Sequence, residues 1–477
     1  MVTDKVTLPL PVKRLGEIFE KNGFTLYAVG GCVRNTLLGL PPSDIDVCSA
    51  AVPAQVMEML SREPGVSCYL KCERLGTLGI NIEDSPDIFQ CEYSAFRTES
   101  YGEGGKHTPD EVSFTQDLEK DAFRRDFSVN ALYAHAITGE ITDPTGGLPD
   151  LHAGVIRTTS PDPEWIIRDD GLRILRMVRF ACELGFSISP PLFRTAREMV
   201  GLLADISKER IREELVKILL ADAKYPQLQK RFITPPHGRG LFLLKALGAY
   251  AYIAPSLLQG VGVGQRKDYH AYDVFTHLLK VCQASPPDLV LRLAGLFHDV
   301  GKPEALRRAG NMYGHDKIGA EMVRAALGGD GLKFDNDTVD TVAKLISIHM
   351  FDLDGRAKES TVRRKFSRVG YDMARRLIQI RAADITGSGR GRINPPEIRK
   401  WERIIADMQR RHTPMGMREL AITGSDISAI TGLPPSPFIG KLKEAAYDYA
   451  VQNPERNNKE ALTSFINKYL KSNPVDS

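Results

Sequence analysis

The amino-terminal part of the chain combines short apolar runs of two different periods. Residues 25–30, 45–47 and 88–95 resemble β-strands, because apolar and polar positions alternate there or form brief apolar runs. Residues 33–38 have the spacing of a short helix and follow a Gly-Gly pair. This mixture predicts a small α/β domain within about the first 150 residues.

Beyond that region the apolar spacing becomes helical almost to the carboxy terminus. Apolar side chains recur at helical intervals over residues 165–184 and 208–220. Stretches rich in glycine or proline at residues 235–240, 260–264 and 388–396 are typical of connectors. We therefore predict that the rest of the chain is mainly α-helical.

Length and composition narrow the class of protein. The chain has 477 residues, 42% of them hydrophobic, which suits a globular protein of about three to four domains. It has no run of about 18 apolar residues and no apolar leader, so we expect no membrane association. Its seven cysteines form no C-x-x-C pair, so we expect reduced thiols and a cytoplasmic location.

The formal net charge of +3 conceals one strongly basic segment. Residues 361–414 contain 14 Lys and Arg against 5 Asp and Glu, including three adjacent arginine pairs. Such a segment can lie along a nucleic-acid backbone. A solvated helical face explains the composition at least as well.

The most specific local pattern is GGCVRNTLLGLPPSDIDV. Asp44 and Asp46 are two residues apart, so on a strand both carboxylates point to one face, about 7 Å apart at Cα. Paired acids repel unless a cation lies between them, and Mg²⁺ prefers carboxylates together with phosphate oxygens. Gly30 and Gly31 open a helix whose free N–H groups suit a polyphosphate, and Arg34 lies one turn further. Either half alone is usually a surface feature, but their combination predicts a nucleotide and metal site.

Two further segments supply candidate site residues. Glu92 lies on the polar face of a predicted strand, where it either completes a carboxylate cluster or is simply exposed. In AFRRDFSVNALY, Arg125 offers donors for phosphate oxygens, and Asp126 and Asn130 share a face if the segment is helical. A carboxylate there can accept a hydrogen bond from a ribose hydroxyl. An acid at a helix start with basic neighbours is an equally good interpretation.

A row of arginines occurs in RDDGLRILRMVRF, residues 168–180, which we predict to be one helix. Asp170, Arg173, Arg176 and Arg179 recur every three residues and form one slowly drifting stripe. Three arginines on a partly buried helix cost free energy unless anions or bases meet them. The alternative is a structural helix held by salt bridges.

The Gly-Gly-x-Val-Arg turn, the acid pair and RRDFSVNA together resemble the class II tRNA nucleotidyltransferases, which include the bacterial CCA-adding enzymes. That family belongs to the DNA polymerase β superfamily, as do bacterial poly(A) polymerases. The resemblance implies a head domain that holds Mg²⁺ at Asp44 and Asp46. Asn35 stands where the family usually has Asp, and Asp169 stands where it usually has Glu.

The resemblance also implies roles for the matching residues. Asp126 would contact the ribose, and Asp170 with Arg173 would read the incoming base, oriented by Arg176 and Arg179. The triphosphate would be held by Gly30, Gly31, Arg34 and Arg125. An Asp acceptor beside an Arg donor complements the Watson–Crick edges of cytosine and adenine. Guanine and uracil present the reverse order and would leave buried polar groups unpaired, so selection needs no nucleic-acid template.

Histidines gather in the middle of the chain, where five of the ten lie between residues 270 and 349. The stretches DVFTHLL, LAGLFHDVGKP and RAADITG resemble the HD domains. The resemblance implies a dinuclear centre with these candidate ligands: His277, His298, Asp299, His315, His349 and Asp384. Imidazole and carboxylate suit a divalent transition metal such as Mn, Fe, Ni or Zn. Core histidines without a metal are the alternative.

Further segments extend the resemblance over about residues 25–465. Residues 96–114 resemble a flexible loop that the family uses in switching from C to A addition, which favours a full CCA enzyme. Residues 206–219 resemble the family's neck helix, and residues 420–462 resemble its carboxy-terminal helical region, which would pack against the outer arm of tRNA.

We predict a polymerase β-like α/β nucleotidyltransferase head followed by mainly α-helical neck, HD and tail domains. The expected domain ranges are residues 1–150, 151–235, 236–388 and 389–477. The expected activity is template-independent addition of CCA to the 3′ end of tRNA from CTP and ATP, by two-metal nucleotidyl transfer. The HD resemblance adds an implied phosphatase or 2′,3′-cyclic phosphodiesterase activity, or else a structural arm for RNA. No oligomeric state is indicated.

Three alternative functions stay open. A poly(A) polymerase would use the same chemistry, but the resemblance to that group stops at the head and neck. A metal phosphohydrolase whose head merely binds nucleotides is the second. A non-catalytic RNA-binding protein is the third, and the paired acids argue against it.

Overall fold

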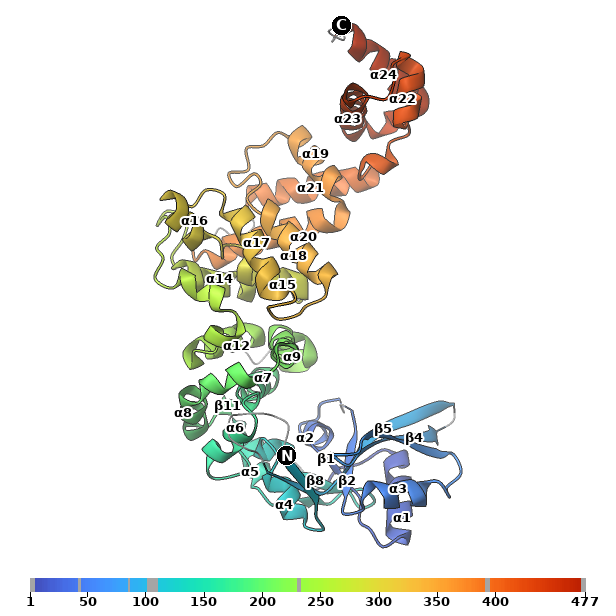
Figure 1. The fold of residues 1–477 in the computed structure, drawn as a ribbon, viewed down its shortest axis with the longest axis vertical. Helices are drawn as coiled ribbons and strands as arrows, with labels where there is room; N and C mark the ends of the chain where they lie inside the picture. The colour runs from blue at the N-terminus through green and yellow to red at the C-terminus, as the bar shows by residue number, and fades with distance from the viewer. Residues whose placement is uncertain are drawn as a thin grey trace. The chain divides into compact units, whose positions relative to one another are not determined.

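The chain forms two compact units, Met1–Pro255 and Ser256–Ser477. The first contains a mixed sheet with helices around it, and the second is helical (Figure 1). The finer domain ranges stay predictions. The computed structural model describes residues 5–41, 44–84, 86–100, 110–229, 233–390 and 395–472.

A seven-stranded mixed sheet is the centre of the first unit, in the order β3-β4-β5-β2-β1-β8-β9. Its strands are β1 (Tyr27–Val29), β2 (Asp46–Ser49), β3 (Val66–Cys72), β4 (Thr77–Asp84), β5 (Asp87–Ala95), β8 (Tyr133–His135) and β9 (Ile141–Thr142). The pairing of β2 with β5 is parallel and the other pairings are antiparallel. The three predicted strands are therefore confirmed as β1, β2 and β5.

One face of this sheet is closed by helices. Val47 of β2 and Tyr93 of β5 are fully buried, and the Tyr93 ring lies 5.7 Å from the ring of Phe19. Phe19 belongs to α1 (Leu10–Lys21), which Figure 1 shows beside α3 (Pro53–Leu60) on this face.

The opposite face is covered only in part. Cys48 of β2 packs there with Ala122 of α4 (Leu118–Phe123). Asp46, two residues earlier on the same face, stays exposed. The short helix predicted after the Gly-Gly pair is confirmed as α2 (Gly31–Leu37). The sheet therefore presents an open region at the amino end of β2.

A group of helices completes the first unit. They are α5 (Gly147–Ala153), α6 (Pro163–Asp169), α7 (Arg173–Leu184), α8 (Pro190–Glu198), α9 (Lys208–Leu219), α10 (Ala221–Lys224), α11 (Pro226–Gln229), α12 (Pro236–Leu247) and α13 (Tyr250–Ile253). Helix α7 packs against both α9 and α12. The helix predicted over residues 208–220 is confirmed as α9.

The single helix predicted over residues 168–180 is wrong, because α6 and α7 are separate. Asp170 between them is extended, with φ −149° and ψ 105°. Its side chain accepts a hydrogen bond from the Leu172 N–H at 3.0 Å, which stabilises a turn in competition with the helix. Gly171 also lies against the Leu202 backbone, where an added Cβ would be 2.9 Å from the carbonyl oxygen. Asp170 therefore lies outside the arginine stripe.

Two other local expectations need correction. Residues 235–240 are mostly the first turns of α12 and not a connector, because Pro236 occupies a first-turn position, where its missing N–H costs nothing. The segment AFRRDFSVNALY is not one helix, since α4 ends at Phe123 and a 3₁₀ turn, Ser128–Asn130, follows. Within the predicted loop, β6 (Arg97–Ser100) pairs with β7 (Glu111–Phe114). Residues 101–109 lie outside the described residues.

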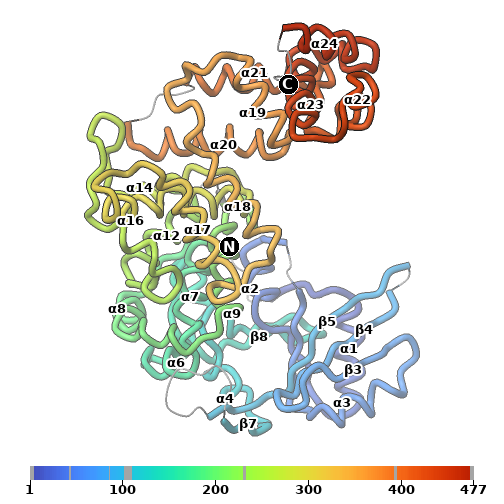
Figure 2. The backbone as a smooth tube through the Cα atoms, turned by 45° about the horizontal axis from the view of Figure 1, so that its top comes forward, coloured from blue at the N-terminus to red at the C-terminus, as the bar shows by residue number. Residues whose placement is uncertain are grey.

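The second unit is built from helices and has two cores. Its helices are α14 (Val274–Ala284), α15 (Leu289–Phe297), α16 (Lys302–Ala309), α17 (His315–Leu327), α18 (Asn336–Ile348), α19 (Glu359–Val369), α20 (Tyr371–Gly387), α21 (Pro396–Arg410), α22 (Gly424–Thr431), α23 (Pro437–Gln452) and α24 (Lys459–Ser472). The last three surround a core of their own that includes Ile427, Leu442 and Leu462. Figure 2 shows these three as a separate cluster after α21.

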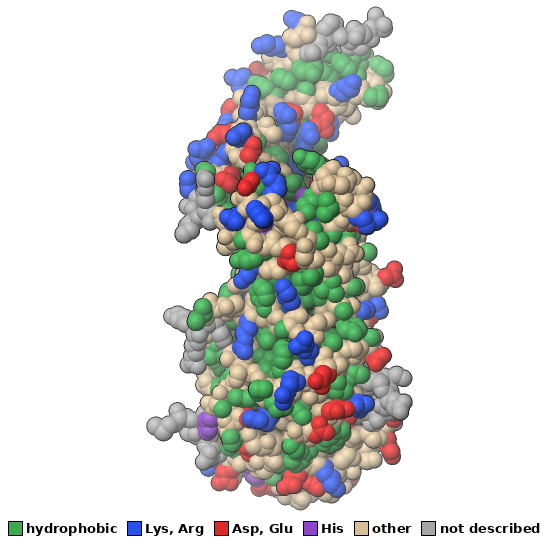
Figure 3. All heavy atoms as spheres, turned by 90° about the vertical axis from the view of Figure 1, so that its left-hand side faces the viewer, with side chains coloured by type: hydrophobic (Ala, Val, Ile, Leu, Met, Phe, Trp, Pro, Cys, Tyr) green, Lys and Arg blue, Asp and Glu red, His purple; other side chains and the backbone are tan. Residues whose placement is uncertain are grey.

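The basic segment at residues 361–414 is extensively paired with acids of the same unit. Arg363 lies 2.5 Å from Asp407, and Arg364 lies 3.0 Å from Asp448. Figure 3 likewise shows basic and acidic side chains beside one another over the carboxy-terminal unit. These contacts favour an ion-paired helical face, and a role along an RNA backbone stays a prediction.

Two global features bear on the protein's environment. No helix in the described part of the chain is both long and apolar enough to cross a membrane. All seven cysteines are free thiols, and five of them are buried.

Candidate active site

A cavity of about 800 Å³ opens in the first unit where the sheet meets the helices that follow it. Nine Lys and Arg and five Asp and Glu line it, an excess of positive charge that suits a polyanion. The lining includes Gly30, Gly31, Arg34, Asp44, Asp46, Arg125, Asp126, Asp170, Arg173, Arg176 and Arg179. One cavity thus collects eleven predicted site residues from segments far apart in the sequence.

The two predicted metal acids are exposed at this cavity. Asp44 precedes β2 and Asp46 begins it, while Ile45 and Val47 are buried. This alternation confirms the expected orientation. Among the described residues, no ion pair neutralises either carboxylate.

The pKa of Asp46 reflects repulsion by neighbouring acids. Glu92 on β5 is its cross-strand partner, and Glu92 Oε2 lies 2.6 Å from Lys71 Nζ. Partial desolvation, followed by the negative charges of Glu92 and Asp44, raises the pKa of Asp46 to about 6. A divalent cation would relieve this repulsion, so the donor set fits one. The oxygens of these three acids are not all within 4.8 Å of one another in the described chain, and Glu92 as a third ligand stays a prediction.

The glycine turn lies directly beside Asp46. Gly30 has φ 81° and ψ −137°, a conformation that glycine adopts readily and other residues do not. A Cβ at this position would lie 3.7 Å from Asp46 Oδ2. The turn therefore brings the first N–H groups of α2 next to the acid pair.

Arg34 is held by a buried polar chain that joins α2 to the later helices. Its Nη1 donates to Asn130 Oδ1 at 2.5 Å, and its Nη2 donates to Asn35 Oδ1 at 2.8 Å. Asn35 in turn donates from Nδ2 to Tyr225 Oη at 2.9 Å. An amide can accept on one side and donate on the other, which a carboxylate cannot do, so Asn35 suits this bridging position.

Arg125 is anchored from behind by an acid that the sequence analysis missed. Arg125 Nη2 lies 3.1 Å from Asp121 Oδ2, and its Nε donates to Tyr133 Oη at 3.0 Å. Asp121 is fully buried and also pairs with Arg124 at 2.6 Å. Although burial opposes ionisation, these two arginines hold the pKa of Asp121 well below its usual value. The i, i+3 and i, i+4 spacing was the available signal.

Asp126 is fully engaged within the protein. Its Oδ2 accepts from Arg176 Nε at 2.8 Å and from Nη2 at 2.5 Å. Its Oδ1 accepts from the Phe127 N–H at 2.8 Å and from Asn130 Nδ2 at 3.2 Å. Although burial opposes ionisation, Arg176 and Arg173 lower the pKa of Asp126 to about 2. A ribose hydroxyl would have to share or replace one of these bonds, and that contact stays a prediction.

The two predicted base-reading side chains line the cavity but bind different partners. Asp170 Oδ2 lies 2.9 Å from Arg210 Nη2. Arg173 donates to the carbonyl oxygens of Ile166 at 2.8 Å and Arg124 at 2.9 Å. Their pairing with a base therefore stays a prediction.

An aromatic ring that the sequence analysis did not single out supports the arginines. The guanidinium carbons of Arg34, Arg176 and Arg179 lie 5.2, 5.4 and 4.3 Å from the centroid of the Phe180 ring. Arg179 also pairs with buried Glu214 of α9 at 3.2 Å. Phe180 directly follows the stripe, which was a usable signal, whereas Glu214 becomes a neighbour only through helix packing.

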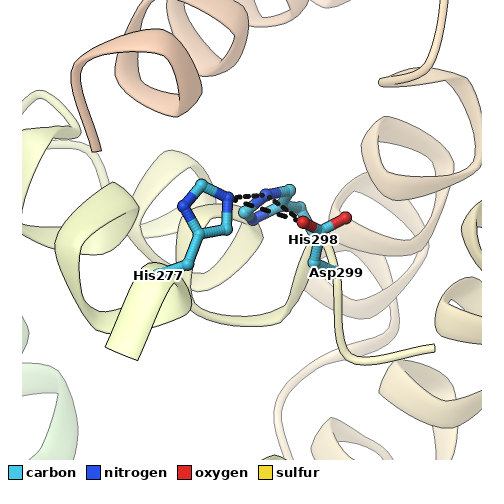
Figure 4. A group of neighbouring side chains, drawn as sticks. All are labelled: His277, His298 and Asp299. Carbon is cyan, nitrogen blue, oxygen red and sulfur yellow. Dashed lines mark hydrogen bonds and ion pairs between the residues drawn. The ribbon is translucent and has the colours of Figure 1, made fainter. Parts of the chain in front are cut away.

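The predicted histidine cluster assembles in the second unit. Asp299 Oδ2 lies 3.4 Å from His277 Nε2 and 3.2 Å from His298 Nε2, while its Oδ1 lies 3.0 Å from His315 Nε2 and 3.6 Å from His349 Nε2. Asp299 thus lies between two pairs of imidazoles. Figure 4 shows His277 on α14 pointing toward His298 and Asp299, just beyond α15.

In three of these imidazoles a backbone carbonyl lies next to Nδ1, and this contact orients the ring so that Nε2 faces Asp299. Nδ1 of His298, His315 and His349 lies 3.0, 2.7 and 2.7 Å from a backbone carbonyl oxygen three residues earlier. Protonated Nδ1 leaves a lone pair on each Nε2, the state a metal ligand needs. Asp384 Oδ1 lies 3.1 Å from His277 Nε2 and is the sixth predicted donor. In the described chain, the close donor groups are His277, His298, Asp299 and Asp299, His315, His349, so the residues fit a divalent transition metal.

Three family models match the chain in the order of its sites. They are described as the poly A polymerase head domain, residues 26–157, a probable RNA and SrmB-binding site of polymerase A, residues 185–259, and the HD domain, residues 268–388. The acid pair lies in the first match and the histidine cluster in the third. The fold and these matches thus define a protein with a head domain of the poly A polymerase class followed by an HD domain.

Curated relatives extend over most of the chain. A CC-adding tRNA nucleotidyltransferase of Thermus thermophilus is 30% identical over 440 residues, 88% of each chain, and an A-adding one of Deinococcus radiodurans is 29% identical over 470 residues. The chain belongs to the tRNA nucleotidyltransferase family. It spans only about half the length of the CCA-adding enzymes of Lactiplantibacillus plantarum and Limosilactobacillus fermentum, each 38% identical.

Solved structures show the same fold. The Bacillus stearothermophilus CCA-adding enzyme in complex with CTP has a TM-score of 0.69 at 24% identity and covers 98% of this chain and 99% of its own. A Thermotoga maritima CCA-adding enzyme complexed with tRNA has a TM-score of 0.61 at 17% identity, covering 96% and 95%. At these identities the likeness establishes the fold alone.

We expect the affinity of the acid pair for Mg²⁺ to depend on pH through Asp46. Its raised pKa means that protons compete with the cation below about pH 6, so the apparent affinity should be about tenfold weaker at pH 5 than at pH 7 and should level off above pH 7. Calorimetric titration of the metal-free protein at several pH values measures this. Glu92→Gln should move the transition to lower pH, and an affinity that is flat from pH 5 to 7 would contradict the assignment.

Proposed function

We propose that this protein adds CCA to the 3′ end of tRNA, using CTP and ATP without a nucleic-acid template. The observation that carries the proposal is a cavity in which two acids, a glycine turn and a set of anchored arginines meet, with no ion pair to either acid from the described residues. The names of the full-length relatives include CC-adding, A-adding and CCA-adding activities, so the product itself needs testing. A cytoplasmic location, which the free thiols favour, is part of the proposal.

In the proposed reaction the terminal ribose 3′-hydroxyl of tRNA attacks the α-phosphate of CTP or ATP and pyrophosphate leaves. Asp44 and Asp46 would hold Mg²⁺, which supplies charge neutralisation for the attacking and leaving oxygens. The start of α2, Arg34 and Arg125 would bind the triphosphate. Because Arg125 is already held by Asp121 and Tyr133, it would need little reordering on binding.

The choice of base is assigned to Asp170 and Arg173. An acceptor beside a donor matches cytosine and adenine and leaves guanine and uracil unpaired. In this structure the Asp170 carboxylate forms an ion pair with Arg210. A bound base would replace Arg210 as a partner of that carboxylate. Arg176 and Arg179, held by Asp126 and Glu214, would support this part of the cavity.

The alternatives receive less support. Poly(A) polymerases share the head model, but the relatives that match most of this chain are tRNA nucleotidyltransferases. A phosphohydrolase acting only through the HD domain leaves the head cavity unexplained. We assign the HD site metal binding, with a divalent transition metal at His277, His298, Asp299, His315, His349 and Asp384 and phosphoester hydrolysis as its implied chemistry.

The activity is tested with tRNA that lacks its 3′ CCA, given CTP and ATP separately and together, followed by sequencing of the products. We expect CC with CTP alone and CCA with both. Asp44→Asn and Asp46→Asn should each lower incorporation roughly a thousandfold, the equivalent of about 4 kcal/mol of barrier. Asp84→Asn, an exposed acid at the end of β4, is the matched control. Full activity in either acid variant would contradict the mechanism.

Base selection is tested with Asp170→Asn, which keeps the shape but replaces one acceptor with a donor. Discrimination of CTP against UTP should fall by about tenfold or more, because the amide can donate to the uracil carbonyl. The ratio of kcat/KM values for the two nucleotides measures this. Glu164→Gln, an exposed acid on α6, should leave the ratio unchanged. Unchanged selectivity in Asp170→Asn would count against the assignment.

The HD assignment is tested by metal analysis of the purified protein. His298→Ala and His315→Ala, one from each side of Asp299, should each lower the bound transition metal, because every removed imidazole takes a ligand from the centre. Nucleotide incorporation should persist, since both residues lie in the second unit. His152→Ala, exposed on α5, is the control. Metal content unchanged in both variants would refute the site.

A further inference from the structure

A row of side chains runs from the acid pair across the open face of the sheet. Asp46 on β2 is opposite Glu92 on β5, Glu92 is opposite Gly79 on β4, and Gly79 is opposite Tyr69 on β3. Cross-strand partners point to the same face, so Tyr69 shares the face of Asp46. Three steps of about 4.8 Å place their Cα atoms about 14 Å apart.

Tyr69 lies flat on this face. A Cβ built on Gly79 would lie 2.3 Å from Tyr69 Cζ and 2.6 Å from its Oη, so the ring covers the glycine. Tyr69 nevertheless keeps 50% of its surface exposed. A ring supported on one side and open on the other is a stacking surface for a nucleobase.

The surroundings of the ring are polar. Lys71 is exposed and pairs with Glu92, and Ser67, Asn81 and Gln90 form the next cross-strand row. These side chains are exposed or half-buried. A polar sheet face with one exposed aromatic ring and a lysine beside it offers a base-stacking surface next to a hydrogen-bond donor for phosphate, which suits single-stranded nucleic acid.

The geometry of the proposed reaction points the RNA toward this face. The attacking and leaving oxygens of phosphoryl transfer lie roughly in line. The cavity that would hold the leaving pyrophosphate includes Gly30, Arg34 and Arg125, and neither Tyr69 nor Glu92 lines it. With the leaving group in the cavity, an in-line 3′-hydroxyl would approach Asp46 from the opposite side, along the row that ends at Tyr69.

We propose that Tyr69 stacks on a base of the single-stranded 3′ end of the RNA primer and that Lys71 contacts its backbone. This inference rests on the proposed function and adds a primer site to it. Because every base has a flat face, stacking holds the strand whichever nucleotide ends it. The site would thus serve successive additions without a change of partner.

Kinetics test the proposal with tRNA lacking its 3′ CCA. Tyr69→Ala should raise the KM for tRNA about fivefold or more and leave the KM for CTP unchanged, whereas Tyr69→Phe should behave like the unaltered protein. Gly79→Ala, which keeps the ring but displaces it, should also raise the KM for tRNA. Leu70→Ala, exposed on the other face of β3, is the control. An unchanged KM for tRNA in Tyr69→Ala, or an equal rise in both KM values, would overturn the proposal.

A second measurement separates this inference from the proposed function. A tRNA carrying fluorescent 2-aminopurine near its 3′ end is titrated with protein without nucleotide. Stacking should quench the fluorescence in the unaltered protein and in Tyr69→Phe but not in Tyr69→Ala. Quenching that is identical in Tyr69→Ala refutes the primer site even if CCA is added. If the protein binds and quenches but adds no nucleotide, the proposed function fails while the primer site stands.

Discussion

The first unit is organised around uncompensated negative charge beside concentrated positive charge. Asp44 and Asp46 face a cavity lined by nine basic side chains, yet no ion pair in the described chain neutralises either acid. The arginines are restrained by other acids, as Asp121 restrains Arg125 and Asp126 restrains Arg176. Because the arginines are held by these acids, they do not form ion pairs with Asp44 and Asp46 in the described chain. The acid pair therefore stays available to a metal ion, and the arginines stay available to a polyanion.

This restraint also couples the sheet to the helices that follow. Arg34 on α2 reaches Tyr225 through Asn35 and Asp126 through Asn130. Each of these buried groups satisfies another, so breaking one bond leaves a polar group unpaired. Because Asp126 also pairs with Arg176, the network links the position of the glycine turn to α7, which carries Arg173. A site made from single contacts to surface loops would lack this rigidity.

The HD site follows a different rule, in which helix ends supply the ligands and close packing brings them together. His298 and His349 cap the ends of α15 and α18, and His315 begins α17. Gly387 of α20 lies so near α14 that a Cβ would be 2.7 Å from the Val281 backbone nitrogen. Small residues at such contacts allow the helices to approach, and the buried Asp299 then bridges histidines from four segments.

The acid pair and the glycine turn follow from short spacing in the sequence, and the six HD donors are implied by the resemblance of three sequence stretches to HD domains. The alternation around Asp46 determines its face whatever surrounds it. Strand register and helix packing decided the contacts between distant segments, which the spacing of residues within one segment does not define. The break at Asp170 depends on a side-chain bond and on contact with Leu202, and the anchoring of Arg179 by Glu214 depends on α7 meeting α9. The row from Asp46 to Tyr69 likewise exists only because four strands align, and alignment is a property of the folded sheet and not of any one segment.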